Sequence, residues 1–343
     1  MDMRDPLAVL AELEAGQPLT TAVSLEKWRL ATPFVIARGA QDAVDLPVVS
    51  LTTQGQMGRG ECCPVPHFGE STESVLAEIS RLLEALANGA RWSELHDHVP
   101  AGAARNAVDC AYWDLMAKVR GMPVWKLLSL GEPVPVETVM TISLGPPDAM
   151  AEAAQGVAGH HTLKIKLGPE QVEETMAAIR MAVPEKQLIV DANEAWHASQ
   201  LGAYMAVLSR HDVLMLEQPL AAGQDDALEC MARPIPVGAD ESVHVVADLD
   251  AASRRYDVVN IKLDKSGGLT EAVRLLRRAA DLKLDVMVGC MLGTSLAMAP
   301  AMLLAPHCRF VDLDAPLLMG SDRFPGLNYH DGWIDPPSPH LWG

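Results

Sequence analysis

Short runs of β-branched and other apolar residues recur along the chain from about residue 137 onward. Between them lie Ala- and Leu-rich stretches with helical spacing, such as EQVEETMAAIRMAV and LTEAVRLLRRAADLKL. This alternation of strand and helix predicts an α/β fold, and eight such units predict a closed (β/α)8 barrel, a modified TIM barrel. The eight runs are VETVMTISL, TLKIKLG, QLIVDAN, VLMLEQP, IPVGADES, VVNIKLD, DVMVGCM and RFVDLDA.

The first part of the chain has a different pattern. Over residues 21–130, alternating segments such as LPVVSLTTQGQMGRGECC are followed by helical ones such as TESVLAEISRLLEALA. We expect an α+β domain in residues 1–130 and the barrel in residues 131–319. The Pro- and Gly-rich tail, residues 320–343, lacks a periodic pattern, and we expect it to pack back on the first domain and complete it.

Most of the eight runs end on a polar residue, and these residues are themselves periodic. Successive positions are about 22 to 27 residues apart, the length of one strand–helix unit. The C-terminal ends of barrel strands surround one mouth, where barrel enzymes place their chemistry, so we expect these positions to form a ring. They are Lys166, Asp191, Glu217, Asp240, Lys262, Gly289 and Asp312.

Three successive positions of this ring are carboxylates: Asp191, Glu217 and Asp240. A single acidic residue at a strand end is commonly just a solvated loop residue, but three in register are poorly explained in that way. An all-oxygen set favours Mg²⁺, with Mn²⁺ as an alternative, over zinc. The sequence therefore predicts a divalent metal site at the barrel mouth.

Lysines flank this predicted metal site. Lys164 and Lys166 are separated by one residue of a strand, so both ammonium groups point to the interior side. We expect repulsion and burial to lower the pKa of Lys166 from about 10.4 towards about 7 to 8, where a lysine can act as a general base. Lys262 comes four strands later and faces Lys166 across the mouth. Two bases on opposite faces of one carbon permit 1,1-proton transfer and inversion of a stereocentre.

The motifs KIK, DANEAW, EQPL, GADES, NIKLDKSGG and GCMLGTS, in this order and spacing, carry a family resemblance. As a set they resemble the enolase superfamily, and within it the muconate lactonizing enzyme subgroup. The run DVMVGCM has no histidine, unlike the seventh strand of the mandelate racemase type. The resemblance covers nearly the whole chain, because the first domain is similar to the family's capping domain, with ATPFVIARG and GECCPVPHFGES as its two specificity loops.

The resemblance implies an isomerase, and most closely a dipeptide epimerase of the L-Ala-D/L-Glu type. In such enzymes a pair at the positions of Asp312 and Asp314 holds the substrate ammonium, and an arginine at the position of Arg38 meets a substrate carboxylate. We expect Lys166 and Lys262 to move the α-proton of the C-terminal residue through an enediolate, while Lys164 holds the substrate carboxylate. Thr141 is a candidate for a hydrogen bond to a substrate carbonyl, or else part of the barrel rim.

Two kinds of alternative stay open. N-succinylamino acid racemase, o-succinylbenzoate synthase and muconate cycloisomerase belong to the same subgroup and would share the metal and the lysines. Asp312 and Asp314 disfavour them, because two carboxylates beside the substrate would repel a second anionic end. A noncatalytic barrel that binds a small metabolite is disfavoured by the retention of three carboxylates and three lysines.

Composition restricts the partners and the compartment. The formal charge of −18 disfavours nucleic acid and anionic membranes as partners. The six cysteines form no CxxC pair, which is typical of reduced, buried thiols, and we find neither a secretion signal nor an apolar run long enough to span a bilayer. We therefore expect a cytoplasmic enzyme. The resemblance implies a small dipeptide substrate of the L-Ala-L-Glu type and suggests a role in peptidoglycan recycling. A homo-oligomer is compatible with both.

Overall fold

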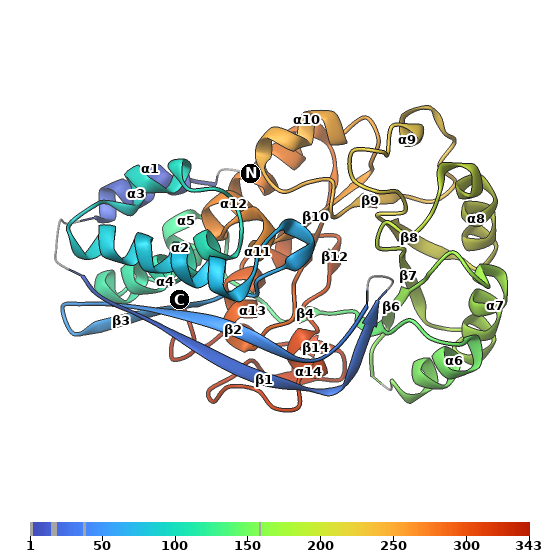
Figure 1. Cartoon of the computed structure of the whole chain (residues 1–343), viewed down its shortest axis with the longest axis horizontal. Coiled ribbons are helices and arrows are strands. Elements are labelled where there is room, and N and C mark those ends of the chain that lie inside the picture. Colours follow the sequence, from blue (N-terminus) through green and yellow to red (C-terminus); the bar gives the residue numbers. More distant parts are fainter. Residues whose placement is uncertain (1–2, 15–18, 37–38, 158) are drawn as a thin grey trace.

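The computed structural model of the chain describes residues 3–14, 19–36, 39–157 and 159–343. Its N-terminal elements, in blue to teal in Figure 1, lie on one side of a barrel whose strands and helices run from green to red. The two parts share one hydrophobic core that extends from the N-terminal helices into the barrel. No helix in the described ranges is long and apolar enough to cross a membrane.

The N-terminal domain is a three-stranded antiparallel sheet with helices packed against it. The strands are β1 (Thr20–Ile36), β2 (Gly39–Thr53) and β3 (Gln56–Glu61), in that order across the sheet. Helices α2 (Thr72–Ala87) and α4 (Ala103–Arg120) contact this sheet, and almost every residue of α4 is buried. The shorter helices are α1 (Pro6–Leu13), η1 (Pro66–Phe68), α3 (Trp92–Leu95), η2 (His96–His98) and α5 (Val124–Leu128).

Two glycines allow β3 to lie directly on α4. A Cβ atom at Gly60 would stand 2.1 Å from the carbonyl oxygen of Ala107, and one at Gly58 would stand 2.2 Å from that of Ala111. Both obstacles are helix backbone, which cannot rotate away as a side chain can. The glycines therefore set the distance between the sheet and the helix, and with it the direction in which β3 leads toward the barrel.

Eight parallel strands form the barrel in chain order, as the sequence predicts. The backbone N–H of Val139 donates to the carbonyl of Val311 at 2.9 Å, which links the first strand to the last. The strands are β5 (Met140–Ile142), β6 (Thr162–Lys166), β7 (Gln187–Asp191), β8 (Val213–Glu217), β9 (Val237–Ala239), β10 (Val258–Lys262), β11 (Asp285–Gly289) and β12 (Phe310–Val311).

The outer helices are less regular than in an ideal eightfold barrel. In the described part of the chain, four of the helices that follow strands, α9, α10, α11 and α14, span only four residues each. The last strand is followed by α14 and then by the tail, so a full eighth helix does not form. The helices are α6 (Pro147–Gly156), α7 (Val172–Ala182), α8 (Ala198–Arg210), α9 (Ala227–Cys230), η3 (Val246–Asp248), α10 (Leu249–Ala252), α11 (Leu263–Ser266), α12 (Leu269–Leu282), α13 (Ser295–Met302), η4 (Ala305–His307) and α14 (Ala315–Leu318).

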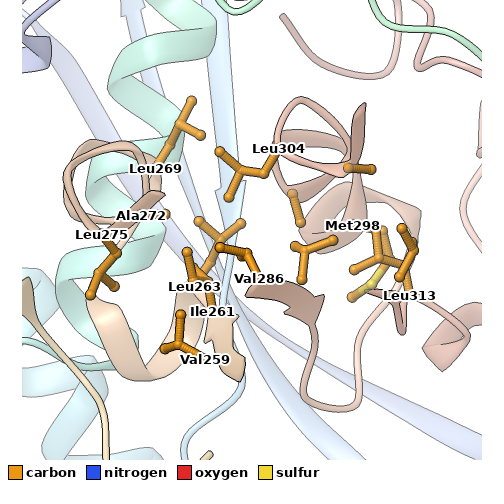
Figure 2. Close-up of a cluster of buried hydrophobic side chains, with 14 of the residues drawn as sticks. Val259, Ile261, Leu263, Leu269, Ala272, Leu275, Val286, Met298, Leu304 and Leu313 are labelled. Atoms are coloured by element: carbon orange, nitrogen blue, oxygen red, sulfur yellow. The ribbon is translucent and has the colours of Figure 1, made fainter. Parts of the chain in front are cut away.

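Strand alternation separates the core from the chemistry, as β10 illustrates. Its side chains Val259 and Ile261 point outward and pack near Leu275 of α12 in the cluster drawn in Figure 2. The alternate side chains point into the barrel, where Val258 belongs to a small apolar cluster with Val139, Ile189, Met215, Met287 and Phe310. This cluster fills the barrel interior at the start of the strands, so the polar side chains of Asn260 and Lys262 lie nearer the C-terminal mouth.

The tail contacts the N-terminal domain. Its strands β13 (Tyr329–His330) and β14 (Trp333–Ile334) form a small sheet with β4 (Val136–Glu137). At the C-terminus, the indole N–H of Trp342 donates to the carbonyl of Cys110 at 3.0 Å, and the N–H of Gly343 donates to Asp114 at 2.7 Å. The expected return of the tail to the first domain is therefore observed, while the domain limits at residues 130 and 320 stay a prediction.

We predict that Gly60→Ala lowers the free energy of unfolding by about 2 kcal/mol or more, because the new methyl group meets helix backbone in a filled interface. Gly156→Ala is the matched control, since a Cβ atom there meets nothing within 4 Å. Chemical denaturation of both variants measures the difference. Equal stability of Gly60→Ala and the parent chain would contradict the close packing of β3 on α4.

Candidate active site

The predicted ring of strand-end side chains comes together at the barrel mouth. All of its charged members are buried. Lysines lie on β6 and β10, and carboxylates lie between them, on or just after β7, β8 and β9, and also just after β12. The charged ring members are Lys166, Asp191, Glu217, Asp240, Lys262 and Asp312, and the buried side chains of Lys164 and Asp314 lie beside them.

A cavity of about 760 Å³ opens above this ring and is lined by both parts of the chain. The N-terminal domain contributes mainly apolar side chains, among them Phe34, Ile36 and Phe68. The barrel contributes the three lysines, three of the carboxylates and Thr141, whereas Asp191 and Glu217 do not reach the cavity wall. Its volume lies within the range of about 300 to 1,000 Å³ that is usual for small-molecule sites.

The lysines of β6 are paired with carboxylates. Lys166 Nζ lies 2.6 Å from Asp191 Oδ2, and Lys164 Nζ lies 2.7 Å from Asp312 Oδ2 and 2.8 Å from Glu217 Oε2. Burial alone would lower the pKa of Lys164, but Asp312, Glu217 and Asp191 raise it well above its usual range. Repulsion between the two ammonium groups therefore does not dominate at Lys164, because its carboxylate neighbours outweigh it.

Lys262 lies in a comparable environment. Its Nζ is 2.7 Å from Asp240 Oδ2, and Lys265 Nζ is 2.8 Å from the other carboxylate oxygen. Burial would lower the pKa of Lys262, but the Asp240 carboxylate outweighs it and raises that pKa above its usual range. Burial has the opposite effect on Asp240, whose pKa the two lysines hold well below normal. Charge pairing thus accounts for most of the electrostatics of the mouth.

The donor set of Asp191, Glu217 and Asp240 fits a hard divalent cation. In the described residues no group of three His, Cys, Asp or Glu side chains stands in metal-binding geometry, because lysine ammonium groups hold these carboxylates. Even so, burial together with the Asp191 and Asp240 charges raises the pKa of Glu217, although Lys164 Nζ lies 2.8 Å from its Oε2. Three buried oxygen donors that repel one another would be relieved by a divalent cation.

Two polar residues that the sequence reading passed over position these carboxylates. Asn260 Nδ2 donates to Glu217 Oε1 at 2.7 Å, and Gly289 leaves room for it, since a Cβ atom there would lie 2.5 Å from Asn260 Oδ1. Gln218 Oε1 accepts from the N–H of Asp240 at 2.9 Å, which fixes the end of β9 relative to β8. Asn260 could have been recognised from the sequence, because it is a polar residue inside the apolar run VVNIKL and Gly289 ends the next strand.

Asp312 and Asp314 lie together on the cavity wall beside β5. The Asp314 carboxylate accepts a hydrogen bond from the backbone N–H of Thr141 at 2.7 Å. Burial and the neighbouring Asp312 charge raise the pKa of Asp314 to about 6. A positively charged group in the cavity would favour the ionised form of this pair.

Arg38 lies outside the described residues. The residues on either side of that gap, Ile36 and Gly39, both line the cavity. The second expected specificity loop is described, and it docks on the barrel: His67 Nε2 lies 2.7 Å from Glu194 Oε2, and the ring of Phe68 meets that of His244 at 4.5 Å. This loop therefore forms one wall of the cavity rather than a free surface.

Comparison with known proteins agrees with this geometry. Residues 148–339 match the family described as enolase C-terminal domain-like, and residues 19–129 match the mandelate racemase / muconate lactonizing enzyme N-terminal domain. The chain belongs to this enzyme family. The predicted membership of the enolase superfamily is thus confirmed, together with the barrel and its capping domain.

Two curated relatives have closely related substrates. The L-Ala-D/L-Glu epimerase of Escherichia coli strain K12 is 46% identical, over 91% of this chain and 98% of that protein. The N-acetyl-D-glutamate racemase of a Pseudoalteromonas species is 42% identical, over 86% of this chain and 94% of that protein. Both relatives are isomerases, and the name of each includes a glutamate residue or derivative.

Two solved structures have the same fold. An enolase family member from Agrobacterium tumefaciens, with bound sodium and L-Ala-L-Glu, is 43% identical, covers 95% of this chain and all of its own, and superposes with a TM-score of 0.92. A dipeptide epimerase from Enterococcus faecalis, in complex with Mg and L-Leu-L-Tyr, is 28% identical, covers 94% of this chain and 98% of its own, and has a TM-score of 0.87.

We predict that Mg²⁺ stabilises the folded chain and that Glu217→Gln removes most of this effect. At a Mg²⁺ concentration one hundred times the dissociation constant, the gain should be about 2.7 kcal/mol. Thermal unfolding with Mg²⁺ and with EDTA measures it without any assay of activity. Glu271→Gln is the control, because that buried carboxylate lies on α12 and accepts from the N–H of Val246. An unchanged Mg²⁺ shift in Glu217→Gln would remove Glu217 from the metal site.

Proposed function

We propose that this enzyme is a Mg²⁺-dependent dipeptide epimerase that inverts the α-carbon of the C-terminal residue of its substrate. The observation that carries the proposal is the combination of lysines on opposite strands, Lys166 and Lys262, with the carboxylates of Asp312 and Asp314 on the same cavity. The lysines suit proton transfer at one carbon from two sides. The paired carboxylates suit a substrate that presents an ammonium group.

In the proposed reaction one lysine, as the free amine, takes the α-proton and the other, as the ammonium, returns a proton to the opposite face. The enediolate that forms between the two steps carries one more negative charge than the substrate. Lys164, which contacts the carboxylates of Glu217 and Asp312, would hold the substrate carboxylate. Asp191, Glu217 and Asp240 would hold Mg²⁺, which would supply positive charge near this developing negative charge.

Asp312 and Asp314 would bind the N-terminal ammonium of the dipeptide. Charge-assisted hydrogen bonds are strong in a partly buried site, and a cation there offsets the repulsion that raises the pKa of Asp314. Thr141 supports this role indirectly, because its N–H fixes the Asp314 carboxylate. The assignment also separates the dipeptide proposal from the other reactions of the subgroup, whose substrates lack an ammonium at that end.

A second candidate is the racemisation of an N-acylated amino acid, as in the N-acetyl-D-glutamate racemase to which the chain is 42% identical. Such a substrate shares the reacting carbon and the glutamate side chain with L-Ala-L-Glu but has no ammonium group. It would leave the buried charges of Asp312 and Asp314 without a partner from the substrate, which is costly. We therefore place the dipeptide first.

We further propose that the substrate is of the L-Ala-L-Glu type and that Arg38 pairs with the acidic side chain. A guanidinium suits a carboxylate geometrically, and the chain on both sides of Arg38 lines the cavity. A role in peptidoglycan recycling, a cytoplasmic location and a homo-oligomeric state belong to the same proposal. They rest on the family resemblance and the composition. Mn²⁺ is proposed as a substitute for Mg²⁺, because it prefers the same oxygen donors.

The proposed function predicts exchange of the α-proton of the glutamate in L-Ala-L-Glu when the enzyme is incubated with Mg²⁺ in D₂O. Proton NMR should show loss of that signal and appearance of the L-Ala-D-Glu isomer. Lys166→Ala and Lys262→Ala should each lower epimerisation by about 100-fold or more, while each retains exchange with a single stereoisomer. Full epimerisation by either variant would contradict the two-base mechanism, and no exchange in the parent enzyme would contradict the proposed substrate.

Removing the substrate ammonium distinguishes the two candidate functions. We expect N-acetyl-L-Ala-L-Glu to lose at least about tenfold in kcat/KM relative to L-Ala-L-Glu, because the charge-assisted bonds to Asp312 and Asp314 are absent. In Asp314→Asn the preference for the free amine should shrink, whereas in the control Asp225→Asn, a buried carboxylate paired with Arg255, it should persist. Equal turnover of the free and acetylated dipeptides, or preferred turnover of N-acetylglutamate, would overturn the dipeptide assignment.

A further inference from the structure

An ion pair between buried Glu61 and half-buried Arg323, outside the catalytic mouth, joins the N-terminal domain to the C-terminal tail. Glu61, the last residue of β3, is 1% exposed. Its Oε2 accepts from Arg323 Nη2 at 2.6 Å, Arg323 Nε at 3.0 Å and Thr294 Oγ1 at 2.6 Å, and its Oε1 accepts from the N–H of Thr294 at 2.7 Å. Four hydrogen bonds from two donor residues therefore fix this carboxylate.

The same guanidinium also holds a second strand of the capping domain. Arg323 Nη2 donates to Glu26 Oε2 at 2.7 Å, and the ring of Trp28 lies 5.4 Å from the guanidinium carbon. Arg323 Nε donates in addition to Thr294 Oγ1 at 2.7 Å, next to the start of α13. One side chain from the tail thus connects β1, β3 and a barrel helix, which are far apart in the sequence.

Each of these three segments leads directly into a wall of the cavity. Strand β1 continues to Phe34 and Ile36, and the chain after Glu61 runs through Cys63 to the loop 64–68. The segment before Thr294 contains Met291 and Leu292, which also line the cavity. The ion pair therefore lies where three walls begin, while Glu61, Thr294 and Arg323 do not line the cavity themselves.

We propose that Arg323 and Glu61 are positioning residues that hold these three walls in register, and so set how tightly the cavity binds its substrate. The dipeptide part of this inference rests on the function proposed above; the structural part does not. A lysine at position 323 would keep the charge but lose the planar fork, which binds Glu61, Glu26 and Thr294 at once. Without the guanidinium, Glu61 would remain buried with a charge that only Thr294 partners.

The tail itself is anchored separately, which makes a variant of Arg323 informative. Asp322 accepts from the N–H of Ser295 at 2.9 Å and also from its hydroxyl, and Ser295 Oγ accepts from the N–H of Leu327 at 2.8 Å. Loss of the Arg323 side chain should therefore leave the backbone of the tail on α13. The expected consequence is loosening of the three cavity walls rather than release of the tail.

The test compares Arg323→Lys and Arg323→Met with the parent enzyme by hydrogen–deuterium exchange of the Mg²⁺-bound protein. We expect faster exchange in residues 30–36, 63–68 and 290–294, and unchanged exchange in the barrel strands β6 to β10. Arg233→Met is the matched control: it removes a bidentate pair with Asp257, at 2.9 and 3.0 Å, near the start of β10 and away from the cavity. This variant should leave all three segments protected.

Kinetics provides the second readout. With L-Ala-L-Glu, Arg323→Lys should raise KM by about tenfold and change kcat much less, because the catalytic groups all come from the barrel. Glu61→Gln combined with Arg323→Met should cost less than the sum of the single changes, since the two residues act as one unit. If the parent enzyme does not turn over dipeptides, the proposed function fails while the exchange test still stands. Unchanged exchange in the three segments of Arg323→Lys, or exchange equal to that of Arg233→Met, would overturn the positioning role.

Discussion

The need to pair buried charges at one end of a closed barrel governs the rest of the structure. Carboxylates and ammonium groups occupy the C-terminal ends of successive strands, and nearly all of them are out of water. Charges in such a place persist only when each has a partner of opposite sign. The five carboxylates, Asp191, Glu217, Asp240, Asp312 and Asp314, exceed the four buried lysines of the mouth by one, so a bound cation would offset the remaining negative charge. Binding of a metal ion and binding of a substrate ammonium would both depend on the net charge of the buried side chains at the barrel mouth.

Much of this arrangement could be predicted from local patterns in the sequence. The eight apolar runs, their spacing and the polar residues that end them define the strands, and strand geometry brings those ends together. The period-2 alternation places Lys164 and Lys166 on one side without further information. What local pattern could not supply is the partner of each charge, because Lys164 contacts Asp312 across 148 residues of sequence. For that reason the sequence did not indicate that carboxylates would outweigh the repulsion at Lys164.

The contacts between the domains could not be predicted from local sequence patterns either, because the residues that make them are far apart in the chain. The glycines of the KSGG motif could be recognised as part of a family pattern, but their role is steric: a Cβ atom at Gly268 would lie 2.5 Å from the Asp109 carboxylate, and one at Gly267 would lie 2.3 Å from Arg105 Nε. Likewise, Asp264 accepts from the N–H of Cys63 at 2.9 Å and so ties a capping loop to the segment after Lys262. Such contacts join residues more than 150 positions apart and leave no periodic signal.

The two parts of the molecule contribute different groups to the cavity. The barrel contributes the charged groups, and their positions follow from strand ends that cannot move without breaking the sheet. The capping domain contributes apolar walls, carried on a hairpin and a loop whose positions depend on a few polar anchors, such as Asp264 and Arg323. A substitution in a wall can therefore change the shape of the cavity while the charged groups of the barrel stay in place. Under the positioning role proposed for Arg323, a substitution in an anchor would act on several walls together and so change selectivity without any contact with the substrate.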